Sequence, residues 1–140
     1  MDSPKRKAPN RWLLLTVVCG ALFIIMMQNT TINLANPDIM RDFGVSMTTV
    51  EWVLTSYMLA FTSFLITMGK LGDAVGRKKM FGIGIALYML GGILAGLSQS
   101  MAALIASTVL QGLGGSAMMP ATQSLIAANF EKNERGKAMG

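Results

Sequence analysis

Three long stretches of the sequence contain no charged residue, and they limit what kind of fold the chain can adopt. They cover residues 12–37, 52–69 and 80–130. A helix needs roughly 20 apolar residues to cross a bilayer, so each of the first two stretches fits one span. The third is long enough for two spans and is interrupted near its middle by Ser98-Gln99-Ser100. We therefore expect an all-α integral membrane protein with four transmembrane helices.

The expected spans leave a short polar segment at each end of the chain. We place the spans at about 12–36, 51–69, 80–97 and 101–130. Residues 1–11 form a basic tail, and residues 131–140 form a polar loop that leads toward a fifth helix missing from this chain. Pro37 is expected to close the first span, since proline disfavours helix in the residue before it. Residues 38–50 would then form the longest connection.

The composition excludes several classes of function. Cys19 is the only cysteine and the chain has no histidine. A disulfide within the chain, a zinc site of the usual kind and a histidine-based catalytic triad are therefore ruled out. We expect no enzymatic activity, no metal and no cofactor. The net charge of +5 can indicate nucleic-acid binding, but the charges lie between membrane spans, so we expect no nucleic-acid partner.

The basic residues predict how the chain is oriented. Eleven of the twelve Lys and Arg residues fall in the segments 1–11, 69–79 and 131–140, which lie on one side of a four-span chain. Only Arg41 falls on the other side. Because Lys and Arg are enriched in cytoplasmic loops, we expect both termini to be cytoplasmic. The protein is then expected in a plasma membrane, in particular a bacterial inner membrane.

Polar side chains gather in the outer half of the first span. Asn29, Asn33 and Asn36 follow the spacing i, i+4, i+7 and so share one face. Amides are costly against lipid, so these residues either bond to other helices or line a cavity. Gln28 lies about eight residues, and Gln111 about nine residues, from the outer end of its span. At ~1.5 Å per residue, both amides lie ~12–14 Å below the outer surface.

These residues define a candidate substrate cavity. Its predicted lining also includes Thr108, one helical turn from Gln111. The full set is Gln28, Asn29, Asn33, Thr108 and Gln111. Small residues on other faces predict close helix packing. They are Ser56, Ala60, Ser63 and Thr67 in the second span. In the third span, Gly84, Tyr88, Gly92 and Gly96 line one face, which includes the Gly92-xxx-Gly96 pair.

The segment 69–79 holds five charges in eleven residues and is expected to be a tight, water-facing loop between spans two and three. Its sequence is Gly69-Lys70-Leu71-Gly72-Asp73-Ala74-Val75-Gly76-Arg77-Lys78-Lys79. It resembles the signature loop between helices two and three of the major facilitator superfamily, with the pattern Gly-x-Leu-x-Asp-Arg-x-Gly-Arg-Arg/Lys. The one departure is Ala74, where a basic residue is usual.

Other segments resemble the fourteen-helix drug/proton antiporter branch of that superfamily. They are Thr30-xx-Asn33-x-Ala35-x-Pro37, the run 52–60, Gln111-Gly112-x-Gly114 and the run 135–140. The resemblance implies that the chain corresponds to the first four helices of a transporter bundle. It also implies that the segment 69–79 is a cytoplasmic gate, in which Asp73 contacts the other half of the transporter. The implied gate residues are Gly69, Gly72, Asp73, Gly76, Arg77 and Lys78.

Two positions depart from what the branch usually carries. Gln28 stands where an acid is usual, and Thr108 stands where an arginine is usual. Neither side chain titrates, and the charge-free stretches contain no acid. A proton gradient remains one candidate energy source, but coupling would then use residues beyond position 140, or another ion. Loss of both charges is consistent with a neutral polar site in place of a buried charge pair.

Three functions follow from these observations. The first is a secondary active transporter that exports drugs or other small amphipathic molecules by alternating access, with the bilayer, a small-molecule substrate and the remainder of the transporter as partners. The second is a self-contained four-helix exporter, which would need a carboxylate that the first span lacks. The third is a truncated membrane protein that packs against partners without transport of its own.

Overall fold

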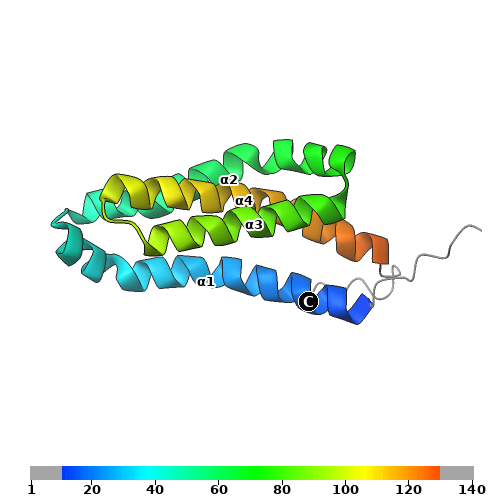
Figure 1. Cartoon of the computed structure of the whole chain (residues 1–140), viewed down its shortest axis with the longest axis horizontal. Coiled ribbons are helices and arrows are strands. Elements are labelled where there is room, and N and C mark those ends of the chain that lie inside the picture. The colour runs from blue at the N-terminus through cyan, green and yellow to red at the C-terminus, as the bar shows by residue number, and fades with distance from the viewer. Residues whose placement is uncertain (1–10, 130–140) are drawn as a thin grey trace, which may run out of the picture.

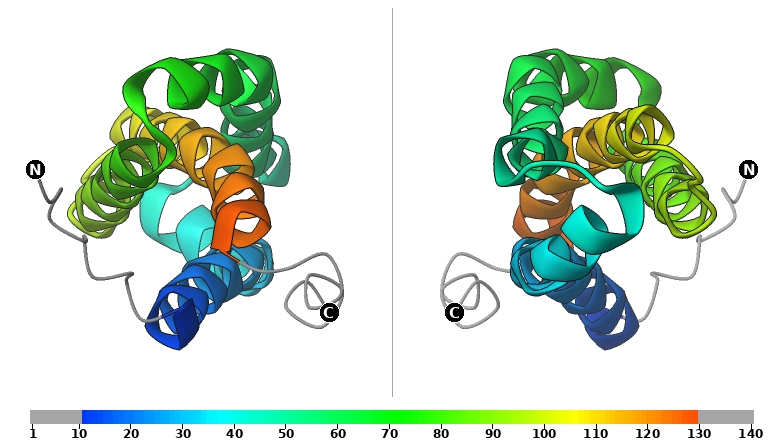
Figure 2. Two further views of the ribbon diagram at one scale, coloured as in Figure 1. Left: turned by 90° about the vertical axis from the view of Figure 1, so that its right-hand side faces the viewer. Right: turned by 90° about the vertical axis from the view of Figure 1, so that its left-hand side faces the viewer.

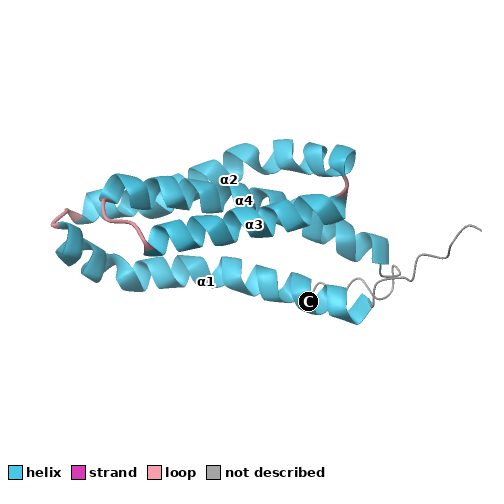
Figure 3. Cartoon of the chain, in the orientation of Figure 1, coloured by secondary structure: helices cyan, strands magenta, loops and turns pink. Residues whose placement is uncertain are grey.

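The computed structural model describes residues 11–129, which consist of helices and short connections (Figure 3). The helices are α1 (Arg11–Phe43), α2 (Met47–Val75), α3 (Arg77–Gly96) and α4 (Met101–Asn129). Each is long and apolar enough to cross a membrane. The expected all-α fold with four membrane-spanning helices is therefore confirmed for this part of the chain. The predicted tail 1–11 lies outside the described residues except for Arg11, and the predicted loop 131–140 lies wholly outside them.

The four helices run back and forth along one axis (Figure 1). The start of α1, the connection from α2 to α3 and the end of α4 lie at one end of the bundle. The connections from α1 to α2 and from α3 to α4 lie at the other. The charged segment 69–79 is thus at the same end as Arg11, as the charge count predicts. Which end faces the cytoplasm stays a prediction.

Helix α4 is the centre of the bundle and α1 lies at its side (Figure 2). Half of the apolar window of α4 is buried, compared with 18% of that of α1. Large apolar side chains on α1 are exposed, among them Phe23 (64%), Met26 (74%) and Leu34 (80%). Apolar side chains of this size on a water-facing surface would be unfavourable. These faces of α1 are therefore suited to lipid or to further helices.

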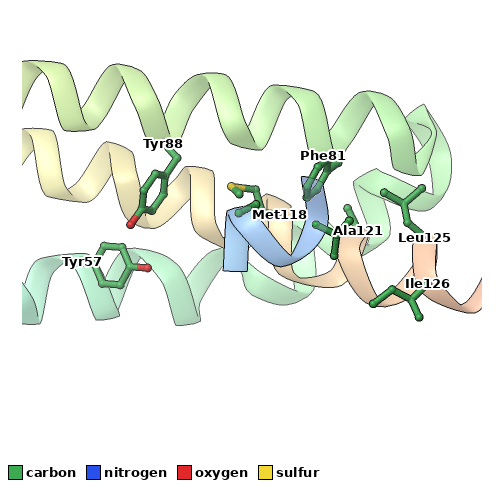
Figure 4. Packing of buried hydrophobic residues seen from close by; sticks show 9 residues of the cluster. Tyr57, Phe81, Tyr88, Met118, Ala121, Leu125 and Ile126 are labelled. Atoms are coloured by element: carbon green, nitrogen blue, oxygen red, sulfur yellow. The ribbon is translucent and has the colours of Figure 1, made fainter. Parts of the chain in front are cut away.

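The core lies where α4 meets its neighbours (Figure 4). It includes Tyr57 of α2, Phe81 and Tyr88 of α3, and Met118 and Leu125 of α4. The ring of Tyr57 also stacks on that of Phe61, with the ring centroids 6.1 Å apart. Aromatic and methionine side chains fill the space between helices that approach one another closely.

The glycines that allow close approach are not the predicted pair. A Cβ added at Gly114 would lie 2.6 Å from the backbone N of Tyr88, and one added at Gly84 would lie 2.9 Å from the backbone O of Gly114. A Cβ added at Gly96, by contrast, would meet nothing within 4 Å. The predicted face is therefore correct for Gly84 and wrong for Gly96. A Cβ added at Gly92 would lie 3.3 Å from Nε2 of Gln111, and the closest backbone contacts of α3 are at Gly84 and Gly91.

The small-residue stripe predicted on the second span is correct for half its length. Ser56 and Ala60 are buried, whereas Ser63 and Thr67 are exposed. A Cβ added at Gly112 of α4 would lie 2.5 Å from the backbone O of Tyr57 and 2.9 Å from the Cβ of Ala60. At this level of the bundle, α2 and α4 therefore pack closely through Ala60 and Gly112.

Two predicted helix ends are wrong. Helix α1 continues through Pro37 to Phe43, so the connection to α2 is only residues 44–46. Proline removes one backbone hydrogen bond, and an ion pair in the following turn, Asp38 with Arg41 at 3.6 Å, supports the continuation. The segment 69–79 is also mostly helical, because α2 runs to Val75 and α3 begins at Arg77.

Candidate functional site

Three polar side chains from three helices form a hydrogen-bonded cluster within the bundle. The amide Nε2 of Gln28 on α1 donates to Oε1 of Gln111 on α4. The hydroxyl of Tyr88 on α3 donates to Oε1 of Gln28 over 3.2 Å. Gln111 and Tyr88 are only 4% and 6% exposed. Buried polar groups need such partners, so this cluster ties α1 to α3 and α4.

The expectation that Gln28 and Gln111 lie at one level of the bundle is confirmed, because the two amides are in contact. Their depth below the membrane surface stays a prediction. Thr108 lies elsewhere. Its hydroxyl donates to the carbonyl of Ile105 over 2.8 Å and lies 3.2 Å from the hydroxyl oxygen of Ser56 on α2. The two positions that depart from the family pattern are therefore each bonded to a different neighbour and are not paired with one another.

An apolar recess adjoins the polar cluster. It lies between α1, α3 and α4 and has a volume of about 330 Å³, within the usual range for ligand pockets. Val17, Gly20 and Ile24 line it from α1, and Ile85, Met89 and Met118 line it from the other helices. Tyr88 belongs to both the recess and the cluster. This part of the bundle thus offers an apolar surface next to neutral hydrogen-bonding groups.

The structure does not bring the predicted asparagines into this cluster. Asn33 is exposed and lines a different recess, together with Asn36, near the end of α1. The side chain of Asn29 lies outside the described residues. The candidate cavity residues therefore separate into the pair Gln28 and Gln111, the packing contact of Thr108, and a second location at Asn33.

The predicted gate forms the turn between α2 and α3. Gly76 is the single residue between the helices and has φ +107°, a conformation that L side chains rarely adopt. Arg77 donates from Nε and Nη2 to the carboxylate of Asp73 over 3.3 Å, and from Nη1 to the carbonyl of Ser124 over 3.4 Å. Arg77 therefore joins the turn to α4.

The remaining gate residues have less specific surroundings. Lys78 is exposed and lines a recess shared with Leu125 of α4. A Cβ added at Gly69 would lie 3.7 Å from Pro120, and one at Gly72 would lie 3.5 Å from Met80. Both distances are ordinary contacts. Alanine would therefore fit at both positions among the described residues.

Tyr88 and Ser56 are the polar partners that sequence reasoning missed. Tyr88 stood out only as a member of a glycine-lined face, and Ser56 only as a small residue. A tyrosine at the middle of a predicted membrane span is a usable signal, because its hydroxyl must find a partner there. The identity of that partner depends on helix packing.

Comparisons with known proteins agree with these features. Residues 18–140 match the model of a protein family described as the Major Facilitator Superfamily. The chain is 34% identical over 130 residues to the riboflavin transporter RibZ of Clostridioides difficile, covering 93% of this chain and 28% of the relative. It is 38% identical over 133 residues to the puromycin resistance protein pur8 of Streptomyces alboniger, covering 94% and 26%.

A third relative is the multidrug resistance protein Stp of Mycobacterium tuberculosis. The identity is 37% over 134 residues, covering 94% of this chain and 25% of the relative. The chain thus spans about a quarter of the length of these curated relatives.

Proposed function

This chain belongs to the major facilitator superfamily, and on that premise we propose that it forms the first four helices of a secondary active transporter. The transporter exports small amphipathic molecules by alternating access about a site near the membrane midplane. Two relatives named for resistance to puromycin and to multiple drugs support export as the direction. The relative named as a riboflavin transporter supports a wider range of substrates.

The observation that carries this proposal is the polar cluster beside the apolar recess. Gln28 and Gln111 offer amide donors and acceptors, and the recess lined by Ile24 and Met89 offers apolar surface. An amphipathic solute matches this combination, with its apolar body in the recess and its polar group toward the amides. Methionine side chains adapt to ligands of different shape, which suits several substrates at one site.

The Asp73–Arg77 pair fits the role of a gate. Asp73 is 67% exposed and Arg77 45% exposed, so the pair contributes little to the stability of the fold. The carboxylate of Asp73 remains accessible to a helix from the rest of the transporter, where it can interact with the positive end of that helix. We assign this end of the bundle to the cytoplasm, in agreement with its lysines and arginines.

Energy coupling is assigned to groups outside the polar cluster. Gln28, Tyr88 and Gln111 are uncharged, and the charge-free stretches supply no acid to carry a proton. A proton gradient can drive the transporter only through residues of the longer chain. A second ion is the alternative.

Efflux from inverted or loaded membrane vesicles tests the proposal. The full-length protein that contains these residues is expected to export ethidium, and substitution of Gln28→Leu or Gln111→Leu should lower the initial rate by about tenfold, since each removes a hydrogen bond from the site. Gln99→Leu is the matched control, because Gln99 is exposed in the connection between α3 and α4. A folded protein that exports nothing would instead support a non-transporting, helix-packing role.

A second measurement addresses coupling. Efflux is followed with an imposed proton gradient and after its collapse by an ionophore. A rate that is unchanged after collapse would remove proton antiport from the proposal while leaving the transport site in place.

A further inference from the structure

A second recess lies between α1 and α2, toward the end of the bundle opposite the charged turn. It has a volume of about 300 Å³. Its polar lining comes from Asn33, Asn36, Glu51 and Thr55, and Met47 and Leu54 add apolar surface. Asn33 lies five residues beyond Gln28 on α1, about 7.5 Å further along the helix axis. This recess is therefore separate from the polar cluster of Gln28 and Gln111.

Helical spacing explains why these residues face one another. Asn33 and Asn36 are three residues apart on α1, and Glu51 and Thr55 are four residues apart on α2. Residues at these spacings share one face of a helix. Each helix thus contributes one polar pair to the recess, and all four side chains carry an oxygen that can accept a hydrogen bond.

Asn36 is the residue whose hydrogen bonding is incomplete. It is only 9% exposed, and its Oδ1 atom is buried without a hydrogen-bond partner among the described residues. Buried acceptors without a donor are uncommon in native proteins and call for an explanation. Asn36 lines the recess, and its terminal side-chain torsion is broad, so rotation about it can bring this oxygen into contact with a ligand there. A ligand that donates a hydrogen bond there would satisfy it.

The charges around the recess favour a positive ligand. Glu51 is exposed and places a carboxylate at the recess. The basic residue on the neighbouring turns of α1, Arg41, lies 3.6 Å from the carboxylate of Asp38 and 3.9 Å from that of Asp42. No lysine or arginine lines this recess among the described residues. Its net charge is therefore negative.

An alkylammonium group matches the recess better than a bare metal ion does. An ammonium carries three N–H donors and no acceptor, which suits a set of oxygen acceptors with one carboxylate. Met47 and Leu54 offer contact to an alkyl chain, whereas a bare metal ion gains nothing from an alkyl side chain. The described part of the chain also has no group of three His, Cys, Asp or Glu residues that could hold a metal.

We propose that this recess binds the ammonium group of an amphipathic amine. The ammonium donates to the carboxylate of Glu51 and to the carbonyl oxygens of Asn33 and Asn36, while the alkyl chain lies on Met47 and Leu54. Binding at this site does not require transport, whereas its role as a stop on a transport path rests on the proposed function.

Equilibrium binding of n-hexylammonium to the full-length protein in nanodiscs tests the site, with empty nanodiscs and n-hexanol as controls for partition into lipid. Glu51→Gln should weaken hexylammonium binding by about tenfold, the effect of losing one charged hydrogen bond. Asp42→Asn is the matched control. It also removes one negative charge at this end of the bundle, but Asp42 lies on α1 and does not line the recess. It should change binding by less than about twofold, since exposed charges are screened.

Several results would overturn the proposal. These are equal weakening by Glu51→Gln and Asp42→Asn, equal binding of hexanol and hexylammonium, or sodium chloride alone giving tighter saturable binding than the amine. Asn36→Leu provides a second variant, and circular dichroism confirms that each variant is folded. If the full-length protein exports ethidium but does not bind the amine, this site alone is refuted. If it binds the amine but does not export ethidium, only the proposed function is refuted.

Discussion

Substitution of Gly114 by alanine should separate α3 from α4. The added Cβ would lie 2.6 Å from the backbone N of Tyr88, 2.8 Å from the backbone O of Gly84 and 2.9 Å from the Cα of Tyr88. All three atoms belong to the α3 backbone, so no side-chain rotation relieves the contact. The two helices must move apart by several tenths of an ångström. That movement reduces dispersion contacts along the interface, because these fall steeply with distance.

The expected loss in stability follows from two opposing terms. Overpacking of a close contact costs about 1–3 kcal/mol, and replacing glycine by alanine in a helix returns about 1 kcal/mol. We expect the free energy of unfolding of Gly114→Ala to lie about 2 kcal/mol below that of a helical Gly→Ala control without a clash. Gly82→Ala is that control, because Gly82 lies on α3 and a Cβ added there would meet nothing within 4 Å.

Unfolding by sodium dodecyl sulfate in mixed micelles, followed by far-ultraviolet circular dichroism, measures both variants. Gly82→Ala should be as stable as the wild type or slightly more so. Equal stability of Gly114→Ala and Gly82→Ala would show that the backbone contact at Gly114 does not set the spacing of α3 and α4. The predicted origin of the helix packing would then be wrong.

Three further predictions concern the polar cluster and the gate. Gln28→Glu should make the free energy of unfolding depend on pH, since only the protonated carboxyl can donate to Gln111 as the amide does. Unfolding in detergent should show higher stability at about pH 5 than at about pH 8. An unchanged pH profile would contradict the hydrogen bond. Gly76→Ala should cost about 1–2 kcal/mol in unfolding free energy, because φ +107° strains an L residue; a neutral result would argue against this turn. Asp73→Asn should change the unfolding free energy by less than about 1 kcal/mol, because the pair with Arg77 is exposed, yet it should lower ethidium efflux several-fold. Lys79→Gln, at an exposed residue of the same turn, should leave efflux unchanged. Equal efflux in the two variants would remove the gate role.

The fold could be predicted from the sequence because charge-free stretches permit few alternatives. Helices that cross a bilayer satisfy their own backbone hydrogen bonds, so length and charge alone place them. Helix ends are less constrained. Pro37 lies within α1 because proline disfavours helix without forbidding it. The charged segment 69–79 is helical because charge excludes it from lipid but does not exclude helix in water.

The site could be predicted only in part, because it depends on which helix faces meet. Equal depth brought Gln28 and Gln111 together correctly, since depth is a linear property of each helix. The rotation of a helix about its own axis, in contrast, cannot be obtained by counting residues along the span. Of the predicted face, Gly84 packs against the backbone of α4 and Gly96 does not, and the second close backbone contact is at Gly91, one residue from the predicted Gly92. The contact of Tyr88 with Gln28 follows from the same rotation and was equally hidden.

The hydrogen bonds inside the bundle differ in what a ligand can gain from them. The amides of Gln28 and Gln111 already satisfy one another, so a solute that bonds to them must first break that bond, which offsets part of the free energy it gains. Oδ1 of Asn36 has no such partner, so a donor there removes an existing penalty. A transporter must release what it binds, which requires the central site to bind weakly. The closed amide pair is suited to a passing substrate, and the open acceptor near the end of α1 is suited to holding a specific group.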